Sequence, residues 1–145
     1  MRLEAPEATE ALGRALAGEL RRGDVIALFG DLGAGKTTFT RGLLSGLGFS
    51  GDVASPTFPI VQPYDDVRVP LWHVDLYRIE DPSELDELAL DEARGDYVLV
   101  IEWPERLGSA LWPDALRLHL VVAEAGARSL TAHVPPAWEG RWPPR

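Results

Sequence analysis

Apolar runs and helical periodicity divide the first third of the chain into a helix, a strand and a second helix. Residues 6–23 predict an amphipathic helix that ends at Gly23, because apolar side chains recur there with a period of 3.6 residues. Its inward positions are Ala11, Leu12, Ala15, Leu16 and Leu20. The uninterrupted apolar run Val25–Phe29 predicts a strand that is buried on both faces. The segment Thr37–Leu47 has the length and periodicity of the next helix.

The remainder of the chain continues the alternation of strands and helices. Strands are predicted over Thr57–Tyr64, Val69–Tyr77 and Tyr97–Glu102, a helix over Pro82–Arg94, and a hairpin from Leu116–Val122 and Ser129–Val134. We therefore expect an α/β fold: a single P-loop NTPase-like domain over residues 1–134, with a mixed central β-sheet flanked by helices. Residues 135–145 form a tail rich in Pro and Trp, which we expect to be poorly ordered.

The composition of the chain excludes or disfavours several classes of function. The 145 residues suffice for one compact domain, and no apolar run approaches the roughly 18 to 20 residues of a membrane helix. The first residues lack the basic start and apolar core of a secretory signal, so we expect a cytoplasmic protein. The absence of cysteine excludes thiolate catalysis and disulfides. A net charge of −9 disfavours direct contact with nucleic acid, which is bound through clustered Lys and Arg.

The segment Gly30–Thr37 carries the most specific chemical signal in the chain. It matches the phosphate-binding pattern GxxxxGK[ST], and it lies between a predicted strand and a predicted helix. Glycines let consecutive N–H groups approach phosphate oxygens, and the helix N-terminus favours an anion. Lys36, the only lysine among the 14 basic residues, would reach the β- and γ-phosphates, and the Thr37 hydroxyl would ligate Mg²⁺. Guanine readers use an Asn/Thr-Lys-x-Asp motif that needs a second lysine, so we expect ATP.

Two predicted strands end in an acidic residue. The apolar residues Val98–Ile101 precede Glu102, and the segment Leu71–Val74 precedes Asp75. Because nucleotide sites of open α/β sheets lie at the carboxyl ends of strands, both carboxylates are candidates for the catalytic site beside Lys36. We expect Glu102 near the Mg²⁺, directly or through water, and Asp75 holding a metal-bound water or orienting the attacking water. The sequence allows these two roles to be exchanged.

Two further features leave alternatives open. The segment Ser55–Phe58 lies where P-loop proteins carry a mobile segment that senses the γ-phosphate, but it is equally well a proline turn that leads into a strand. His73 fits a core or strand position better than a metal ligand.

Four motifs in a fixed order resemble a known family. GDLGAGKTTFTRGLL, SPTF, HVDLYRI and EWPERL, spread over about residues 7 to 134, are similar to the TsaE (YjeE) family of bacterial P-loop ATPases. The resemblance implies a weak ATPase, activated by two partner proteins of the TsaB and TsaD type. Together they make threonylcarbamoyladenosine at position 37 of tRNAs that read ANN codons, and tRNA contact by this chain is expected to be indirect. ATP hydrolysis would support turnover of that complex rather than form the threonylcarbamoyl-adenylate intermediate.

The resemblance also implies a set of site residues. Thr37 and Glu102 are expected to be the Mg²⁺ ligands, and Asp75 the acid of the HxDxYR motif. A threonine of the family's first helix corresponds to Thr9, and a late arginine corresponds to Arg128. The expected ATP-binding residues are Thr9, Gly30, Gly33, Ala34, Gly35, Lys36, Thr37, Thr38 and Arg128. The tail after Val134 matches no pattern of the family.

Two other functions share the same loop. A small-molecule or nucleoside kinase would add an acceptor pocket and an arginine-rich lid, but the stretch between Tyr77 and Tyr97 is acidic. A nucleotide-dependent binding module would change conformation without hydrolysis, and Asp75 and Glu102 argue against it. Phosphate release, and its transfer to small acceptors, would separate these functions.

Overall fold

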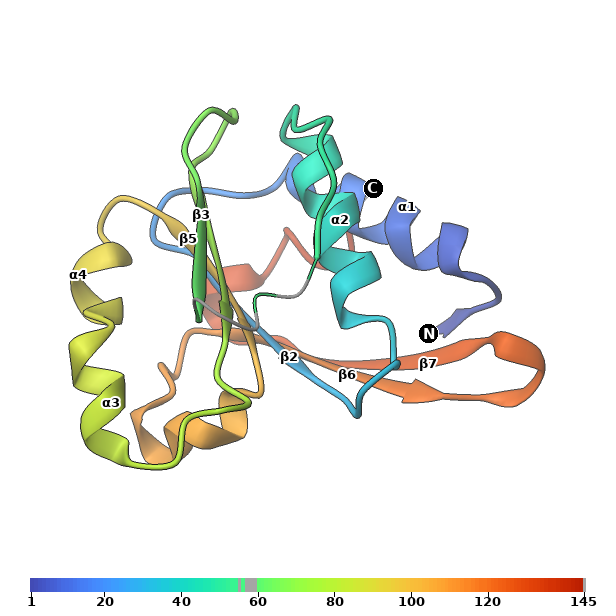
Figure 1. Ribbon diagram of the computed structural model, residues 1–145. Helices are drawn as coiled ribbons and strands as arrows, with labels where there is room; N and C mark the ends of the chain where they lie inside the picture. Colours follow the sequence, from blue (N-terminus) through green and yellow to red (C-terminus); the bar gives the residue numbers. More distant parts are fainter. Residues whose placement is uncertain (55, 57–59, 145) are drawn as a thin grey trace.

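A mixed β-sheet forms the centre of the molecule. The computed structural model describes residues 1–54, 56 and 60–144. Within these ranges, seven strands follow the order β1-β7-β6-β2-β5-β4-β3 (Figure 1). Their bounds are Arg2–Leu3 (β1), Val25–Phe29 (β2), Val61–Tyr64 (β3), Leu71–Asp75 (β4), Val98–Glu102 (β5), Leu116–Val122 (β6) and Arg128–His133 (β7). The inner strands β4, β5, β2 and β6 are parallel, and the outer pairs β3–β4, β6–β7 and β1–β7 are antiparallel. The expected α/β fold with a mixed sheet is confirmed.

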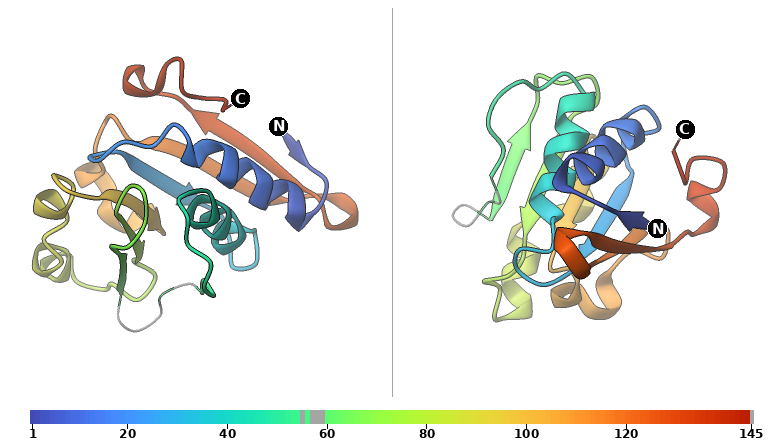
Figure 2. Two further views of the ribbon diagram at one scale, coloured as in Figure 1. Left: turned by 90° about the horizontal axis from the view of Figure 1, so that it is seen from above. Right: turned by 90° about the vertical axis from the view of Figure 1, so that its right-hand side faces the viewer.

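Helices cover both faces of this sheet (Figure 2). They are α1 (Pro6–Ala17), α2 (Lys36–Gly46), α3 (Pro82–Glu87) and α4 (Leu90–Ala93), with a 3₁₀ segment η1 over Pro104–Ala110. Strand β2 separates two hydrophobic clusters, as a strand with two buried faces should. Ile26 and Leu28 pack in the cluster that contains residues of α1 and α2, whereas Val25 and Ala27 pack in the cluster that contains residues of α4 and η1.

Helices α1 and α2 pack against each other through glycine. A Cβ atom on Gly13 would lie 2.3 Å from the carbonyl oxygen of Phe39, and one on Gly42 would lie 2.1 Å from that of Glu10. This close approach turns Gly13 into the interface, so the buried face of α1 differs from the predicted one. Ala11, which we expected to face inward, is exposed.

Two of the predicted helices differ in extent from what periodicity alone predicts, whereas α2 has the predicted length. Helix α1 ends at Ala17, with Gly18 as its C-cap, instead of at Gly23. Farther along, the carboxylate of Asp24 accepts a hydrogen bond from the backbone N–H of Arg21 (2.7 Å) and holds a turn there. The single helix predicted over Pro82–Arg94 is divided into α3 and α4, since Ala89 adopts a left-handed conformation with φ of 53°. Of the strand predicted over Thr57–Tyr64, residues 57–59 lie outside the described residues, and β3 begins at Val61.

The tail is packed onto the domain, contrary to our expectation of poor order. Trp138 is 1% exposed and belongs to the same core cluster as α1 and α2. The guanidinium of Arg141 lies 4.0 Å from the centre of the Trp138 ring and forms an ion pair with Asp24 (2.7 Å). An ion pair this deeply buried requires a fixed geometry, so the tail closes over the corner between α1 and β2.

None of the helices in residues 1–54, 56 and 60–144 is long and apolar enough to cross a membrane.

Candidate functional site

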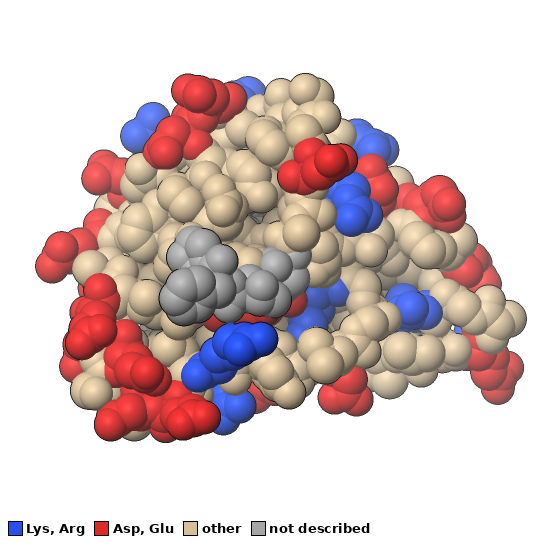
Figure 3. Space-filling view, viewed as in Figure 1, with Lys and Arg blue, Asp and Glu red and all other residues tan. Residues whose placement is uncertain are grey.

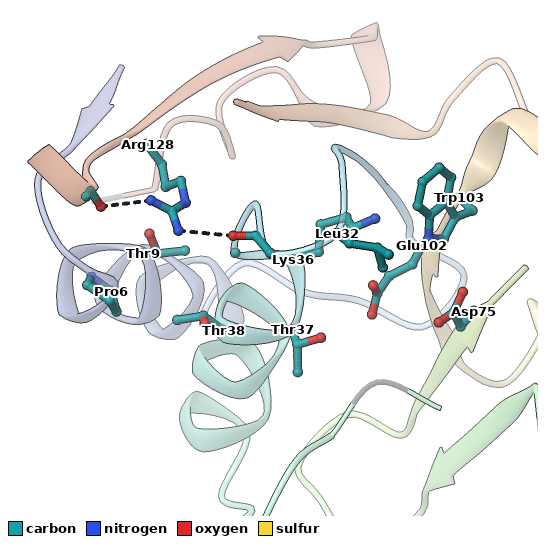
Figure 4. A pocket seen from close by; sticks show the side chains of 13 residues that line it. Pro6, Thr9, Leu32, Lys36, Thr37, Thr38, Asp75, Glu102, Trp103 and Arg128 are labelled. Atoms are coloured by element: carbon teal, nitrogen blue, oxygen red, sulfur yellow. Dashed lines mark hydrogen bonds between the residues drawn. The ribbon is translucent and has the colours of Figure 1, made fainter. Parts of the chain in front are cut away.

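A pocket lies at the carboxyl edge of the parallel strands, where β2 leads through the glycine-rich loop into α2 (Figure 4). Most of the residues predicted for the site line it. They are Thr9, Gly33, Gly35, Lys36, Thr37, Thr38, Asp75, Glu102 and Arg128. Gly30 and Ala34 belong to the same loop but are not among the residues that line the pocket. Residues from five separate parts of the chain thus meet at one place.

The glycines of the loop occupy positions that other residues would strain. Gly30 has a φ of 153°, and a Cβ atom there would lie 2.7 Å from the carbonyl oxygen of Leu120 on β6. Gly35 caps α2 in a left-handed conformation with a φ of 106°. The loop therefore passes close to β6 and enters α2 through conformations that favour glycine.

Lys36 is folded back over its own loop. Its side chain is almost fully buried, and Nζ donates a hydrogen bond of 2.6 Å to the carbonyl oxygen of Gly30. Nζ also lies 4.2 Å from the centre of the Trp103 ring. Trp103 itself has a φ of 58°, a conformation that costs free energy in a non-glycine residue and is concentrated at functional sites.

Asp75 and Glu102 end two neighbouring parallel strands and are direct partners in the β4–β5 register. They are 9% and 3% exposed. The backbone N–H of Tyr77 donates a hydrogen bond to Asp75 Oδ1 (3.0 Å). Two carboxylates at adjacent strand ends, beside a lysine and the Thr37 hydroxyl, make a concentrated set of hard oxygen donors, the type of ligand that Mg²⁺ prefers.

His73, which the sequence interpretation placed at a core or strand position rather than as a ligand, does not line the pocket but contacts a residue that does. It is completely buried, and its Nε2 lies 2.6 Å from Glu102 Oε2. The HVDLYRI segment carried a signal for this: a histidine two residues before Asp75 shares its face of the strand. Its contact with Glu102 depends on strand pairing, which the segment does not reveal.

The opposite end of the pocket is formed by α1 and the β6–β7 turn. Arg128 donates hydrogen bonds to the carbonyl oxygens of Gly33 (3.0 Å), Ala34 (3.1 Å) and Gly126 (2.8 Å), so it braces the loop against the hairpin. Thr9 is 1% exposed, and its hydroxyl oxygen has no hydrogen-bond partner within the described part of the chain. Pro6, Leu32, Trp103 and Gly126 also line the pocket, although they were not among the predicted site residues.

Charge is unevenly distributed around the site. In Figure 3, acidic side chains gather over α3 and α4, whereas Lys and Arg side chains lie nearer the middle of the same face. The acidic run from Glu80 to Glu92 covers α3 and most of α4, and none of its residues lines the pocket. Ser55 and Thr57, the candidates for sensing a γ-phosphate, lie outside the described residues.

Within those residues, no group of three or more His, Cys, Asp or Glu side chains is arranged to hold a metal by itself. At phosphate sites, Mg²⁺ is held by one or two carboxylates together with phosphate oxygens and water. Thr37 and Glu102 are a donor set of that kind, and both line the pocket.

Comparison with known proteins gives one family for this arrangement. Residues 3–130 match the model of the family described as "Threonylcarbamoyl adenosine biosynthesis protein TsaE". The chain is 46% identical over 122 residues to the tRNA threonylcarbamoyladenosine biosynthesis protein TsaE of Bacillus subtilis, covering 83% of this chain and 75% of the relative. It is 45% identical over 126 residues to the protein of the same name from Streptomyces coelicolor, covering 85% of each. The crystal structure of Bacillus subtilis YdiB superposes with a TM-score of 0.83 at 34% identity, covering 97% of this chain and 88% of that one.

Proposed function

The chain belongs to the TsaE family, which acts in the biosynthesis of threonylcarbamoyladenosine in tRNA, and from this premise we propose that it binds ATP with Mg²⁺ and hydrolyses it. The observation that carries the proposal is the register pair of Asp75 and Glu102. It joins two carboxylates in the same pocket as Lys36 and the hydroxyl of Thr37. A glycine-rich loop alone would support phosphate binding, but hydrolysis also requires groups that hold a metal and orient water.

In this proposal, different residues of the pocket bind the phosphates, the metal and the attacking water. Lys36 exchanges its contact with the Gly30 carbonyl for the β- and γ-phosphate oxygens. Thr37 and Glu102 hold Mg²⁺, which when bound neutralises charge on the transferred phosphoryl group. Asp75 orients the attacking water, whose oxygen bonds to the γ-phosphorus as the bond from that phosphorus to ADP breaks. The products are ADP, inorganic phosphate and the proton that the water releases to solvent.

The other end of the pocket is where the nucleoside would lie. The buried hydroxyl of Thr9 lacks a partner in the described residues and faces the same pocket as Arg128 and Gly126. An unsatisfied buried hydroxyl is costly, and a hydrogen bond to bound nucleotide would remove that cost. This supports the assignment of Thr9 and Arg128 to nucleotide binding.

Within the family's pathway, this chain would work in the cytoplasm with two proteins of the TsaB and TsaD type. ATP hydrolysis would be weak in the isolated chain and would support turnover of the complex that modifies position 37 of tRNAs reading ANN codons. Contact with tRNA would be indirect, in keeping with a net charge of −9.

The decisive measurement is phosphate release from MgATP by the isolated chain, by the two partners alone, and by all three together. We expect the rate with all three to exceed the sum of the other two. Transfer of labelled phosphate to a small acceptor would instead indicate a kinase, and binding without any phosphate release would indicate a conformational module. In cells that lack this protein, tRNA threonylcarbamoyladenosine should fall, and normal levels would contradict the assigned pathway.

A further inference from the structure

His73 is a polar residue in an otherwise apolar strand environment. It lies between Trp72 and Val74 in β4, and its side chain has no exposed surface. Burial of an imidazole is unfavourable unless it is hydrogen-bonded, and leucine would satisfy the apolar pattern of this strand without that cost. Packing alone therefore does not explain why a histidine occupies this position.

The partner of His73 is Glu102. Their Nε2 and Oε2 atoms are 2.6 Å apart, and both side chains are buried. The register explains how they meet: Asp75 is opposite Glu102, so His73, two residues earlier, lies diagonally across from Glu102 on the same face of the sheet. A glutamate that binds a metal is ionised and only accepts hydrogen bonds, so in that form Nε2 would carry the proton and donate it to Glu102.

The proposed function takes Glu102 as a metal ligand, so the orientation of its carboxylate affects metal binding. The hydrogen bond from His73 holds one oxygen of Glu102 and so restricts rotation of the carboxylate plane at the wall of the pocket, beside Lys36 and Thr37. Partners of this kind orient ligating groups in metal sites, and their loss typically weakens metal binding by about 10- to 100-fold.

We propose that His73 is a positioning residue for Glu102, holding its carboxylate in the orientation that binds the metal of the metal–nucleotide complex. The proposal rests on the proposed function, because it takes Glu102 as a metal ligand. The quantity that tests this proposal is the metal enhancement, which we define as the Kd for ATP in the presence of chelator divided by the Kd for ATP in the presence of Mg²⁺. Titration calorimetry measures both values. The metal enhancement is a binding quantity and does not depend on hydrolysis.

The test compares three substitutions of His73. His73→Gln keeps an N–H donor near the position of Nε2, so it should retain most of the metal enhancement. His73→Leu removes the donor and should reduce the enhancement about tenfold, while ATP affinity in chelator stays close to that of the wild type. If His73→Leu does not fold, His73→Asn replaces it, because its shorter amide does not reach Glu102. Equal metal enhancement in the Gln variant and in the Leu or Asn variant would overturn the proposal.

Two controls separate positioning from general destabilisation and from failure of the proposed function. Val74→Ala creates a cavity in the same strand but on the opposite face, so it should lower the unfolding temperature and preserve the metal enhancement. Glu102→Gln should lose the enhancement. If Glu102→Gln loses it while His73→Leu keeps it, only the positioning role fails. If the wild type itself shows no enhancement, the assignment of metal binding to this pocket fails as well.

Discussion

The ammonium group of Lys36 lies 4.2 Å from the centre of the Trp103 ring, which joins the first turn of α2 to the residue that follows β5. The same nitrogen is hydrogen-bonded to the carbonyl oxygen of Gly30, so a single cation contacts both the start of the glycine-rich loop and the residue that follows β5. Cation–π contacts are worth about 0.5 to 2 kcal/mol, less than the attraction of the same cation to a phosphate group. Lys36 is thus held in a conformation that it would leave when a triphosphate binds, because its ammonium group would then contact the phosphate oxygens.

The first prediction concerns this lysine. Lys36→Ala should abolish stabilisation by MgATP, because the only lysine of the chain supplies the charge that meets the β- and γ-phosphates. At an ATP concentration of about 100 Kd, the wild type should gain about 2.7 kcal/mol, or roughly 5 to 10 °C in unfolding temperature. Differential scanning fluorimetry measures both proteins, with the exposed Arg22→Ala as a control that retains the full shift. Stabilisation of Lys36→Ala by MgATP to the wild-type extent would rule out the site.

The second prediction separates the role of Glu102 in metal binding from nucleotide binding. Glu102→Gln should lower Mg²⁺-dependent phosphate release at least about tenfold, because it removes a carboxylate ligand, while ATP binding in chelator should change less than about threefold. The exposed Glu105→Gln in η1 is the matched control and should leave both quantities unchanged. Equal losses of binding and of hydrolysis in Glu102→Gln would assign the metal to other residues.

A third prediction follows from the brace between Arg128 and the loop. Arg128→Ala should weaken ATP binding roughly 3- to 10-fold, because the carbonyls of Gly33 and Ala34 lose their partner and the free loop becomes less ordered. Arg128→Lys should not restore affinity, since a single ammonium cannot reproduce the planar fork. Hydrogen exchange of the loop amides reports the order directly. Arg117→Ala, on the neighbouring strand, is the control, and unchanged exchange and affinity in Arg128→Ala would refute the brace.

The tail provides a fourth prediction, on stability. Arg141→Ala should cost roughly 3 to 5 kcal/mol in the free energy of unfolding, because it leaves the buried carboxylate of Asp24 without its charge partner. The double variant with Asp24→Ala should lose less than the sum of the two single changes. Arg14→Ala breaks an exposed ion pair with Glu10 and should cost less than about 0.5 kcal/mol. Urea unfolding measures all of these, and additive losses would show that the ion pair contributes nothing.

A fifth prediction concerns pH. Burial, followed by the nearby charge of His133, lowers the pKa of His119 below its ordinary value of 6.5. The folded state therefore binds this proton less readily than the unfolded chain, so stability is fully present above about pH 6.5 and decreases as the pH falls through that value. His119→Phe keeps the stack on Phe29 and should lose less stability between pH 7.5 and pH 5 than the wild type. An NMR titration that finds the His119 pKa at or above 6.5 would contradict this prediction.

Local patterns determined the parts of this protein that depend on neighbours in the chain. The apolar run Val25–Phe29 and the glycines after it specify a strand, a loop and a helix, and the structure has each of them in that order. The hairpin of β6 and β7 could also be predicted, because two strand-forming segments are separated by a short turn. Phosphate-loop chemistry is also local, because its residue types lie within eight consecutive positions.

Relations between distant parts of the chain were decided by the tertiary structure. The order of the strands makes Asp75 the direct partner of Glu102 and brings His73 within 2.6 Å of the same carboxylate. Packing of the tail against the domain likewise gives Arg141 a buried partner, Asp24, which is 117 residues away in the sequence, although we expected this proline-rich tail to be poorly ordered. Such contacts combine small preferences of many separate segments, and no single segment carries a signal for its partner. The sequence alone therefore identified most of the groups that line the pocket but not Trp103, whereas their pairing depended on how the sheet assembles.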